Sequence, residues 1–327
     1  QIWQSRDPMK TQINWDRLYM VNRLANDAGQ SARYILEERH NDQNEIILHS
    51  TINHRVDNNL KVNGGVEARY TKGMHYKTIA DMLGANSYDD IDQYTENYSP
   101  LSHDIQYNDL NDPYSQKIKD DVFGYNYNMY VYSANAWFQN NYTYSNLDFY
   151  YGARLGYKSF QREGLMKNGR APENSYGYGK THTFVNQSVK GGLTWKPSGN
   201  HIFTVNALYE TRPPQPNNAY ISPRIKDDAV KGLTSESVTH GDVNYNFNTR
   251  FFHGRVSLYR TKFNNQIEID NFFNEELRTF VNSVMTGVDK VHQGIELGIT
   301  GDIMPDLSAT LIGSVSDYFY DSRPTTT

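Results

Sequence analysis

Short polar turns separated by long connections are the feature that most constrains how this chain folds. Five turns have this character: Asp57-Asn58-Asn59, Tyr144-Ser145-Asn146, Pro197-Ser198-Gly199-Asn200, Phe252-His253-Gly254 and Met304-Pro305-Asp306. The last four recur at nearly equal intervals, and apolar and polar residues alternate around each turn, as in strands whose two faces meet different surroundings. Short turns at one end and long loops at the other predict a transmembrane antiparallel β-barrel with short periplasmic turns and long extracellular loops.

Composition agrees with a barrel better than with a pair of soluble domains. The 327 residues are only 37% hydrophobic, yet 13% are aromatic, and 26 are Tyr. A barrel tolerates this because its interior can be wet and only alternate residues must be apolar. The mean hydropathy of −0.76 and the lack of any apolar run near about 18 residues exclude a helical membrane protein.

Charge and cysteine content exclude several other classes. The chain has no Cys, so disulfides, thiolate metal sites and a Cys nucleophile are ruled out. The net charge of −5 comes without a basic stripe, so we expect no nucleic-acid partner. Gln1 is not an initiator Met and no signal-peptide pattern follows it, which we interpret as a mature chain or an internal piece.

The clearest strand covers 147–157, where Leu147, Phe149, Tyr151, Ala153, Leu155 and Tyr157 share one face. Similar alternation is found at 46–56, 60–71, 128–143, 183–195, 201–211, 239–248, 255–268, 290–300 and 307–319. This predicts about ten strands, with an eleventh conceivable at Tyr34–Arg39. The segments are longer than ordinary soluble strands and long enough to cross a bilayer at a tilt.

Two further patterns favour the barrel over a soluble β-sandwich, which stays the alternative. Aromatic residues lie near strand ends, where a membrane barrel carries its girdles: Tyr70, Tyr142, Tyr157 and Trp195. Charged residues lie in mid-strand on the opposite face: Glu67, Arg69, Arg154, Lys190 and Glu296. In a barrel these charges would line the lumen, either for selectivity, for docking an internal plug, or simply as a hydrated surface.

The expected outer loops are 74–127, 162–182, 213–236 and 270–288, all polar and rich in Tyr and Asn. The first is the longest and is acidic, and loops of such length usually carry function. Aromatic residues such as Tyr88, Tyr176, Tyr178 and Tyr220 could stack on sugars or aromatic chelates, or they could be interfacial or loop-packing residues. Sequence does not separate these roles, so the substrate-binding residues are unknown at this stage.

Candidate catalytic and metal-binding patterns are weak. His103 and Asp104 lie in the long loop without a nucleophile elbow. Asp89-Asp90-x-Asp92 lacks the Gly and the distal Glu of an EF-hand loop and is expected to be a solvated acidic segment. Gly64-Gly65 and Gly191-Gly192 lie inside strands, where they allow bending or close approach rather than phosphate binding. We therefore expect no enzyme activity, no catalytic residues, no metal site and no cofactor.

Several segments, in their order along the chain, resemble the barrel of TonB-dependent outer-membrane receptors. The matching segments are Tyr34–Arg39, Leu48–Asn53, Gly64–Glu67, His75–Lys77, Asp81–Gly84, Asp89–Tyr94, Lys196–Ser198, Phe203–Asn206, Thr211–Pro214 and Gly294–Leu297. They are most similar to the Bacteroidota branch that carries an N-terminal carboxypeptidase-like regulatory domain. The resemblance covers nearly the whole chain.

That resemblance implies a location in the Gram-negative outer membrane and active uptake of a scarce or large nutrient: an iron chelate, cobalamin, a glycan or a peptide. Such receptors have a barrel of about 22 strands, a plug inside it, and coupling to TonB, ExbB and ExbD. A surface lipoprotein is a further implied partner. Residues 1–327 show no plug, TonB box or terminal strand, so we interpret the chain as part of such a barrel. A passive porin-like channel and a soluble Tyr-rich glycan-binding or adhesin protein remain the alternatives.

Overall fold

The computed structural model describes residues 4, 6–92, 95, 103–276 and 279–326. Its long strands are β1 (Leu36–Arg55), β2 (Leu60–Asp81), β5 (Val122–Thr143), β6 (Leu147–Gly164), β8 (His182–Ser198), β9 (His201–Arg212), β10 (Glu236–Asn248), β11 (Phe252–Asn274), β12 (Thr279–Met304) and β13 (Leu307–Tyr320). Its short elements are α1 (Pro8–Thr11), α2 (Trp15–Asp27), β3 (Tyr88–Asp89), η3 (His103–Gln106), β4 (Gln116–Lys117), β7 (Gly177–Tyr178), η4 (Pro216–Asn218) and β14 (Thr325–Thr326).

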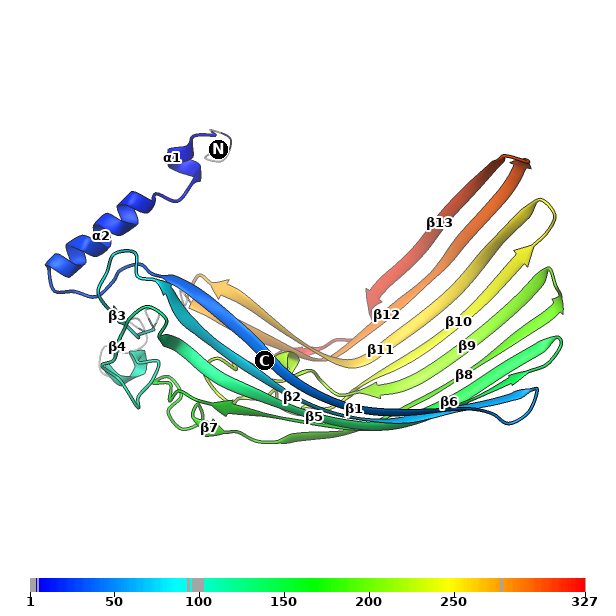
Figure 1. Cartoon of the computed structure of the whole chain (residues 1–327), viewed down its shortest axis with the longest axis horizontal. Coiled ribbons are helices and arrows are strands. Elements are labelled where there is room, and N and C mark those ends of the chain that lie inside the picture. The colour runs from blue at the N-terminus through cyan, green and yellow to red at the C-terminus, as the bar shows by residue number, and fades with distance from the viewer. Residues whose placement is uncertain (1–3, 5, 93–94, 96–102, 277–278, 327) are drawn as a thin grey trace.

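The long strands form one antiparallel meander in the order β1-β2-β5-β6-β8-β9-β10-β11-β12-β13. Figure 1 shows this sheet curved into an open bowl, with β1 and β13 as its two edges. The short turns lie at one end of the strands, and the long connections and α2 lie at the other. The fold is therefore the predicted transmembrane barrel wall, built from hairpins with short turns at one rim.

The prediction of about ten barrel strands is confirmed in the part of the chain that the structure describes, but the strands extend further than predicted. The eleventh strand suggested at 34–39 is wrong, because its residues from Leu36 onward open β1. There β1 pairs residue by residue with β2, from His40 opposite Tyr76 down to Arg55 opposite Lys61. The pairing continues into the loop-side half of β1, where both faces are polar. Hydrophobic alternation therefore indicates only the half of β1 nearer the short turn.

All four predicted outer loops overlap strand residues. Loop 162–182 includes the end of β6 to Gly164 and the strand β7, and Glu236 begins β10. The prediction of a loop at 270–288 is wrong, because β11 runs to Asn274 and β12 begins at Thr279. Within these strands Asp270 pairs with Ser283. The expected loop 74–127 narrows to 82–121 and contains β3, β4 and η3, with residues 93–94 and 96–102 outside the described part. These segments extend the hairpins beyond the apolar band, where a strand needs no apolar face. Their polar composition therefore resembles that of loops, which is why the sequence predicted loops there.

The turns follow local side-chain chemistry. Asp57 Oδ1 accepts hydrogen bonds from the backbone N–H groups of Asn59 and Leu60 at 2.7 and 2.8 Å, which closes the β1–β2 turn. The turn predicted at Phe252-His253-Gly254 is displaced, because the chain reverses between Asn248 and Phe252. Gly254 lies within β11 instead, where a Cβ would come within 2.4 Å of the Gly298 carbonyl oxygen.

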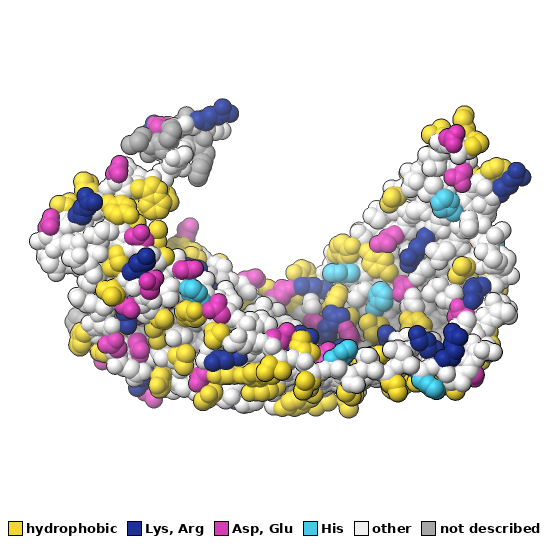
Figure 2. Space-filling view, viewed as in Figure 1, with side chains coloured by type: hydrophobic (Ala, Val, Ile, Leu, Met, Phe, Trp, Pro, Cys, Tyr) yellow, Lys and Arg dark blue, Asp and Glu magenta, His cyan; other side chains and the backbone are white. Residues whose placement is uncertain are grey.

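The convex face of the sheet is apolar and exposed. Leu155, in the middle of β6, is 61% exposed, and Val185, near the loop end of β8, is 70% exposed. One polar residue, Gln187, lies opposite Leu155 on this face. Figure 2 shows hydrophobic side chains gathered along this outer surface below the bowl. So large an exposed apolar surface is unfavourable in water and matches the band that a barrel presents to lipid.

Aromatic rings border this apolar band on both sides. Near the turns Tyr142 stacks on Phe149, with ring centroids 4.5 Å apart. Toward the loops Tyr70 and Tyr132 lie 5.0 Å apart. Between Tyr132 and Tyr142 the strand advances about 10 residues, which at about 3.3 Å each and a tilt of about 40° spans roughly 25 Å along the barrel axis. That height equals the usual apolar band of an outer-membrane barrel.

In the described residues no helix is both long and apolar enough to span a bilayer.

A pair of adjacent residues on β8 tests the assignment of the two faces. Val189 points outward and is 53% exposed, whereas Lys190 occupies the opposite face. We expect Val189→Arg to lower the free energy of unfolding by about 2–4 kcal/mol, because it places a cation near the bilayer midplane. Lys190→Gln is the matched control and should change it by less than about 1 kcal/mol. Reversible urea unfolding in lipid vesicles measures both values; equal losses would contradict the assignment.

Candidate functional site: inner wall and loop layer

The concave face carries all five of the predicted mid-strand charges: Glu67, Arg69, Arg154, Lys190 and Glu296. The strand register puts each of them opposite to the apolar band, with polar cross-strand neighbours such as Asn135 beside Glu67 and Ser257 beside Glu296. Figure 2 shows charged and His side chains gathered within the hollow of the bowl. The inner wall is therefore polar, as a lumen requires.

One group of these side chains, the Glu210 network, has members on four strands, β6, β9, β10 and β11. Arg154 on β6 contacts Glu210 on β9 at 3.4 Å, reaching over the intervening strand β8. Glu210 also pairs with Arg212, and Arg212 lies 4.0 Å from Glu236 on β10. Glu236 accepts a hydrogen bond of 2.7 Å from Gln266 on β11. Opposite charges alternate along this path, so the burial of Glu210, only 9% exposed, is balanced by two cations.

A second group, the Asp242 network, lies closer to the short turns. Tyr150 Oη donates to Asn206 Oδ1 at 3.0 Å, and Asn206 Nδ2 donates to Asp242 Oδ1 at 2.9 Å. His240 Nε2 lies 3.2 Å from the other carboxylate oxygen of Asp242. A Cβ at Gly192 would come within 2.4 Å of both Asn206 and Tyr150. The glycine therefore admits close approach, as predicted, and lets the network lie flat on the wall.

A third contact lies on β1 and β2. Arg69 pairs with Glu45 at 3.4 Å and with Glu67 at 3.7 Å, and Thr71 Oγ1 donates to Glu45 at 3.0 Å. Across all three groups, acidic and basic side chains meet one another rather than forming a ring of one sign. Such a wall offers many directional hydrogen-bonding groups to a hydrated path or to a protein docked inside.

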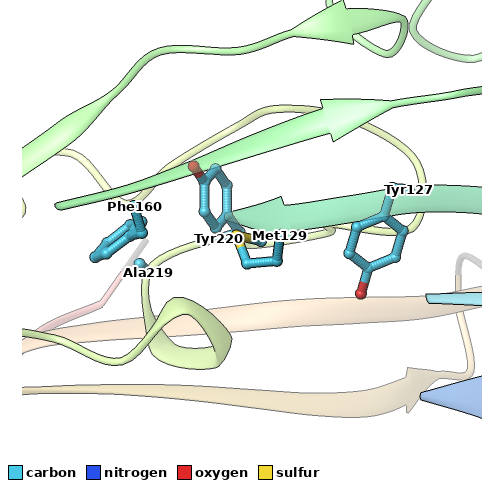
Figure 3. Packing of buried hydrophobic residues seen from close by; sticks show 5 residues of the cluster. All are labelled: Tyr127, Met129, Phe160, Ala219 and Tyr220. Carbon is cyan, nitrogen blue, oxygen red and sulfur yellow. The ribbon is translucent and has the colours of Figure 1, made fainter. Parts of the chain in front are cut away.

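At the loop end, a hydrophobic cluster fixes the connection between β9 and β10 to the inner wall. Figure 3 shows Tyr220 and Ala219, from that connection, beside Phe160 of β6 and Met129 and Tyr127 of β5. Tyr220 is 1% exposed, and its ring lies edge-on to Phe160 with centroids 5.9 Å apart. The loop therefore folds inward over the wall instead of standing free in solvent.

Arg162 hydrogen-bonds to two different loops, one between β6 and β8 and one between β9 and β10. It lies on β6, is 2% exposed, and donates from Nε to the Pro223 carbonyl at 2.7 Å and from Nη1 to the Ser175 carbonyl at 3.0 Å. Its guanidinium also stacks over Tyr127 at 5.3 Å. Burial raises the pKa of Asp227 in the same loop layer, against the backbone N–H of Lys180 that donates to it at 3.0 Å. Ser175 and Pro223 belong to different loops, so one side chain joins them.

Asp90 organises the loop that follows β2. Its Oδ1 accepts from Asn108 Nδ2 at 2.7 Å and from the Gly124 N–H at 2.8 Å. Its Oδ2 is buried and has no hydrogen-bond partner among the residues that the structure describes. Burial raises the pKa of the Asp90 carboxyl, and the two hydrogen bonds oppose that shift only in part. Burial, with the Asp90 charge beside it, raises the pKa of Tyr88 to about 12.

Helix α2, which rests on the loop end of β2, was not predicted from the sequence. Asn14 caps it by accepting from the Arg17 N–H at 3.0 Å. Asn22 is fully buried and donates from Nδ2 to the carbonyls of Tyr34 and Met82 at 2.8 and 2.9 Å. Asn14 ahead of a run of helix formers was the available signal.

The four tyrosines singled out in the sequence fall into two groups. Tyr220 is buried, and Tyr88 packs edge-on against Phe123 with centroids 5.4 Å apart, so both pack loops. Tyr176 and Tyr178 are 59% and 66% exposed at the loop end.

The expectation that the segment Asp89-Asp90-x-Asp92 is solvated is wrong for Asp90, which is buried by the loop around it. Asp89 accepts from Ser31 Oγ at 2.6 Å, Asp90 is held as above, and Asp92 pairs with Arg170 at 3.1 Å. His103 and Asp104 form the short helix η3. Within the described ranges, no three His, Asp or Glu side chains converge as a metal site would require.

Comparison with known proteins agrees with this architecture. The family model described as "TonB dependent receptor-like, beta-barrel" matches residues 3–327. A comparison with curated proteins gave no match. Among solved structures, the copper transporter OprC is 14% identical with a TM-score of 0.61, and covers 88% of this chain and 40% of its own.

Two iron-related receptors show the same fold. The FrpB iron transporter of Neisseria meningitidis, F5-1 variant, is 15% identical with a TM-score of 0.54, covering 85% of this chain and 36% of its own. The ferric yersiniabactin receptor FyuA of Yersinia pestis is 12% identical with a TM-score of 0.51, covering 88% and 37%. The chain thus spans about two fifths of the length of these solved structures.

The chain belongs to the β-barrel family of TonB-dependent receptors, which are transport proteins of the outer membrane. Its convex face is accordingly the lipid-facing surface, and its concave face lines the lumen.

The Glu210 network predicts a difference between two acidic residues of the wall. Glu210→Gln leaves Arg154 and Arg212 without their shared carboxylate and should lower the free energy of unfolding by about 1–3 kcal/mol. Glu45→Gln breaks a more exposed pair with Arg69 and should cost less than about 1 kcal/mol. Denaturant unfolding in vesicles measures both. Equal small losses would show that the network contributes nothing to stability.

Asp90 predicts a pH dependence of the loop after β2. Because burial raises its folded-state pKa, the stability it contributes is present below the unfolded pKa and is lost as pH rises through the folded pKa. Asp90→Asn keeps the acceptor for Asn108 and Gly124 and removes the buried charge, so at neutral pH it should raise the local opening free energy. That gain should shrink as pH falls.

Hydrogen exchange of segments 88–92 and 106–108 at neutral and acidic pH measures this effect. The exposed neighbour variant Asp89→Asn is the control and should follow the wild-type pH dependence. If Asp90→Asn showed the same advantage at both pH values, the buried charge would not be its cause.

Proposed function

We propose that this chain forms part of the transport barrel of an active outer-membrane importer that takes up a scarce or large nutrient. The observation that supports this most directly is the pairing of a lipid-facing apolar face with a polar, mixed-charge inner face in one long meander. The folded loop layer over the inner wall adds a surface where a substrate can be captured before entry.

The remainder of the barrel is proposed to pair with β1 and β13, which each have one described neighbour in the sheet. A free strand edge is unfavourable in lipid, since its backbone groups have no other partners there. A complete receptor would close at about 22 strands around a plug. The Glu210 and Asp242 networks, rich in hydrogen-bonding groups, are suited to contact that plug, and TonB, ExbB and ExbD would supply energy through it.

Several substrate classes are candidates for this importer. The similar solved structures include proteins named as copper and iron transporters, and FyuA is named for a ferric chelate. Metal ions or chelates therefore join glycans, cobalamin and peptides as candidates for this chain. The order of short sequence motifs supports the Bacteroidota branch with its N-terminal regulatory domain, and with it a surface lipoprotein partner.

Uptake by the full-length receptor tests this proposal. A cell that expresses it should accumulate the labelled substrate only when TonB is present and the inner membrane is energised. Equal accumulation without TonB would instead identify a passive porin-like channel. Folding of the purified receptor as a soluble monomer without detergent would support the glycan-binding alternative and contradict the membrane proposal.

Loop capture predicts a difference between the two rims. Replacing the exposed loop-side pair Tyr176 and Tyr178 with Ala should raise the half-saturation concentration for uptake by roughly 5- to 150-fold, because each ring contributes about 0.5–1.5 kcal/mol when stacked. Tyr144→Ala, at an exposed tyrosine of the opposite rim, is the control and should leave it unchanged. Equal effects at both rims would contradict capture by the loops.

A further inference from the structure

The lipid-facing surface is not uniform, because a trough of about 700 Å³ crosses it between β1 and β8. Ala68, Ala134 and Ala136 contribute to its floor, and Ala68 and Ala134 are direct cross-strand neighbours. Leu48, Val66, Leu155, Tyr157 and Val185 also line it. Of these, Leu48 and Val185 are each 70% exposed, so most of their surface is uncovered within the described part of this chain.

The cross-strand pairs that lie next to the trough on β2 and β5 show how deep it lies in the membrane. One pair step toward the loops from Ala68 and Ala134 lies the aromatic pair Tyr70 and Tyr132. One step further, the outward positions become polar, with Lys72 opposite Tyr130. The trough therefore lies in the hydrocarbon region directly below the loop-side aromatic girdle, which is the outer leaflet.

The dimensions of the trough suit one hydrocarbon chain. From β1 to β8 there are four strand spacings of about 4.8 Å, or roughly 19 Å across the strands. At a strand tilt of about 40°, that direction rises roughly 12 Å along the membrane normal. One leaflet of a core about 30 Å thick is about 15 Å deep. A chain lying in the trough would thus stay within a single leaflet.

We propose that this trough holds one acyl chain of an outer-leaflet lipid as a retained, specific ligand. A flat wall touches a neighbouring chain on one side only, whereas the alanine floor and the taller side chains around it contact a chain on several sides. The additional dispersion contacts favour this site over the rest of the surface, and an unfilled trough would forfeit them. The inference depends on the membrane location of the barrel and not on what it transports.

Native mass spectrometry of the full-length receptor, purified from outer membranes in mild detergent, tests the proposal. Wild-type protein should retain bound lipid after extensive detergent exchange. Ala134→Phe fills the trough and should lower lipid occupancy by roughly tenfold, as expected from the loss of a few buried methylene contacts. Ala207→Phe is the matched control, since it adds the same ring to the outward face of β9 beside Gly191 and Gly241, and should retain lipid normally.

Equal lipid retention by the two Phe variants would overturn the proposal. So would a wild-type dimer in detergent that Ala134→Phe alone dissociates, because a second copy of the chain would then occupy the trough. If Ala134→Phe fails to give a folded barrel, the smaller change Ala134→Val decides the question, and unchanged lipid occupancy in that variant would count against the site.

Discussion

The structure depends on one constraint: inside a membrane, every backbone N–H and C=O must find its partner within the protein. The long antiparallel ladders meet it, for example from Tyr127 opposite Gly164 to Thr143 opposite Asp148 between β5 and β6. Once such a ladder exists, alternate residues must face opposite sides. The apolar band and the polar inner wall are therefore two consequences of the same hydrogen-bonding requirement.

On the inner wall, charged groups lie against the sheet and need partners of opposite charge or hydrogen-bond donors. Glu210 forms ion pairs with Arg154 and Arg212, and Asp242 accepts a hydrogen bond from Asn206. Small residues make room for these contacts, as Gly192 does under Tyr150. At the loop end the same principle appears with Arg162, whose buried cation is satisfied by two carbonyls and an aromatic ring. Loops and wall thus form one connected polar and aromatic layer.

Sequence reasoning succeeded where the environment of a strand differs between its two faces. The alternation from Leu147 to Tyr157 predicted β6 and the face of each residue, and the charges from Glu67 to Glu296 lie inside as expected. It failed where both faces are polar, as in β1 above Asn44, and at Gly254, whose close contact with Gly298 depends on a distant strand. Asp90 and Arg162 could not be found either, because their burial arises from loops that meet only in the folded chain.

One face of this meander meets lipid and the other meets water. The chain has no Cys, so single cysteines can be placed along β6 from Asp148 to Lys158 in the full-length receptor without removing any from this segment. Each would carry a nitroxide spin label, and its collision rates with oxygen and with a water-soluble relaxing agent would be measured in vesicles. Labels at Phe149, Tyr151, Ala153 and Leu155 should favour oxygen, and labels at Asp148, Tyr150, Arg154 and Lys158 should favour the water-soluble agent. Accessibility without a two-residue period, or water contact on both faces, would contradict the account.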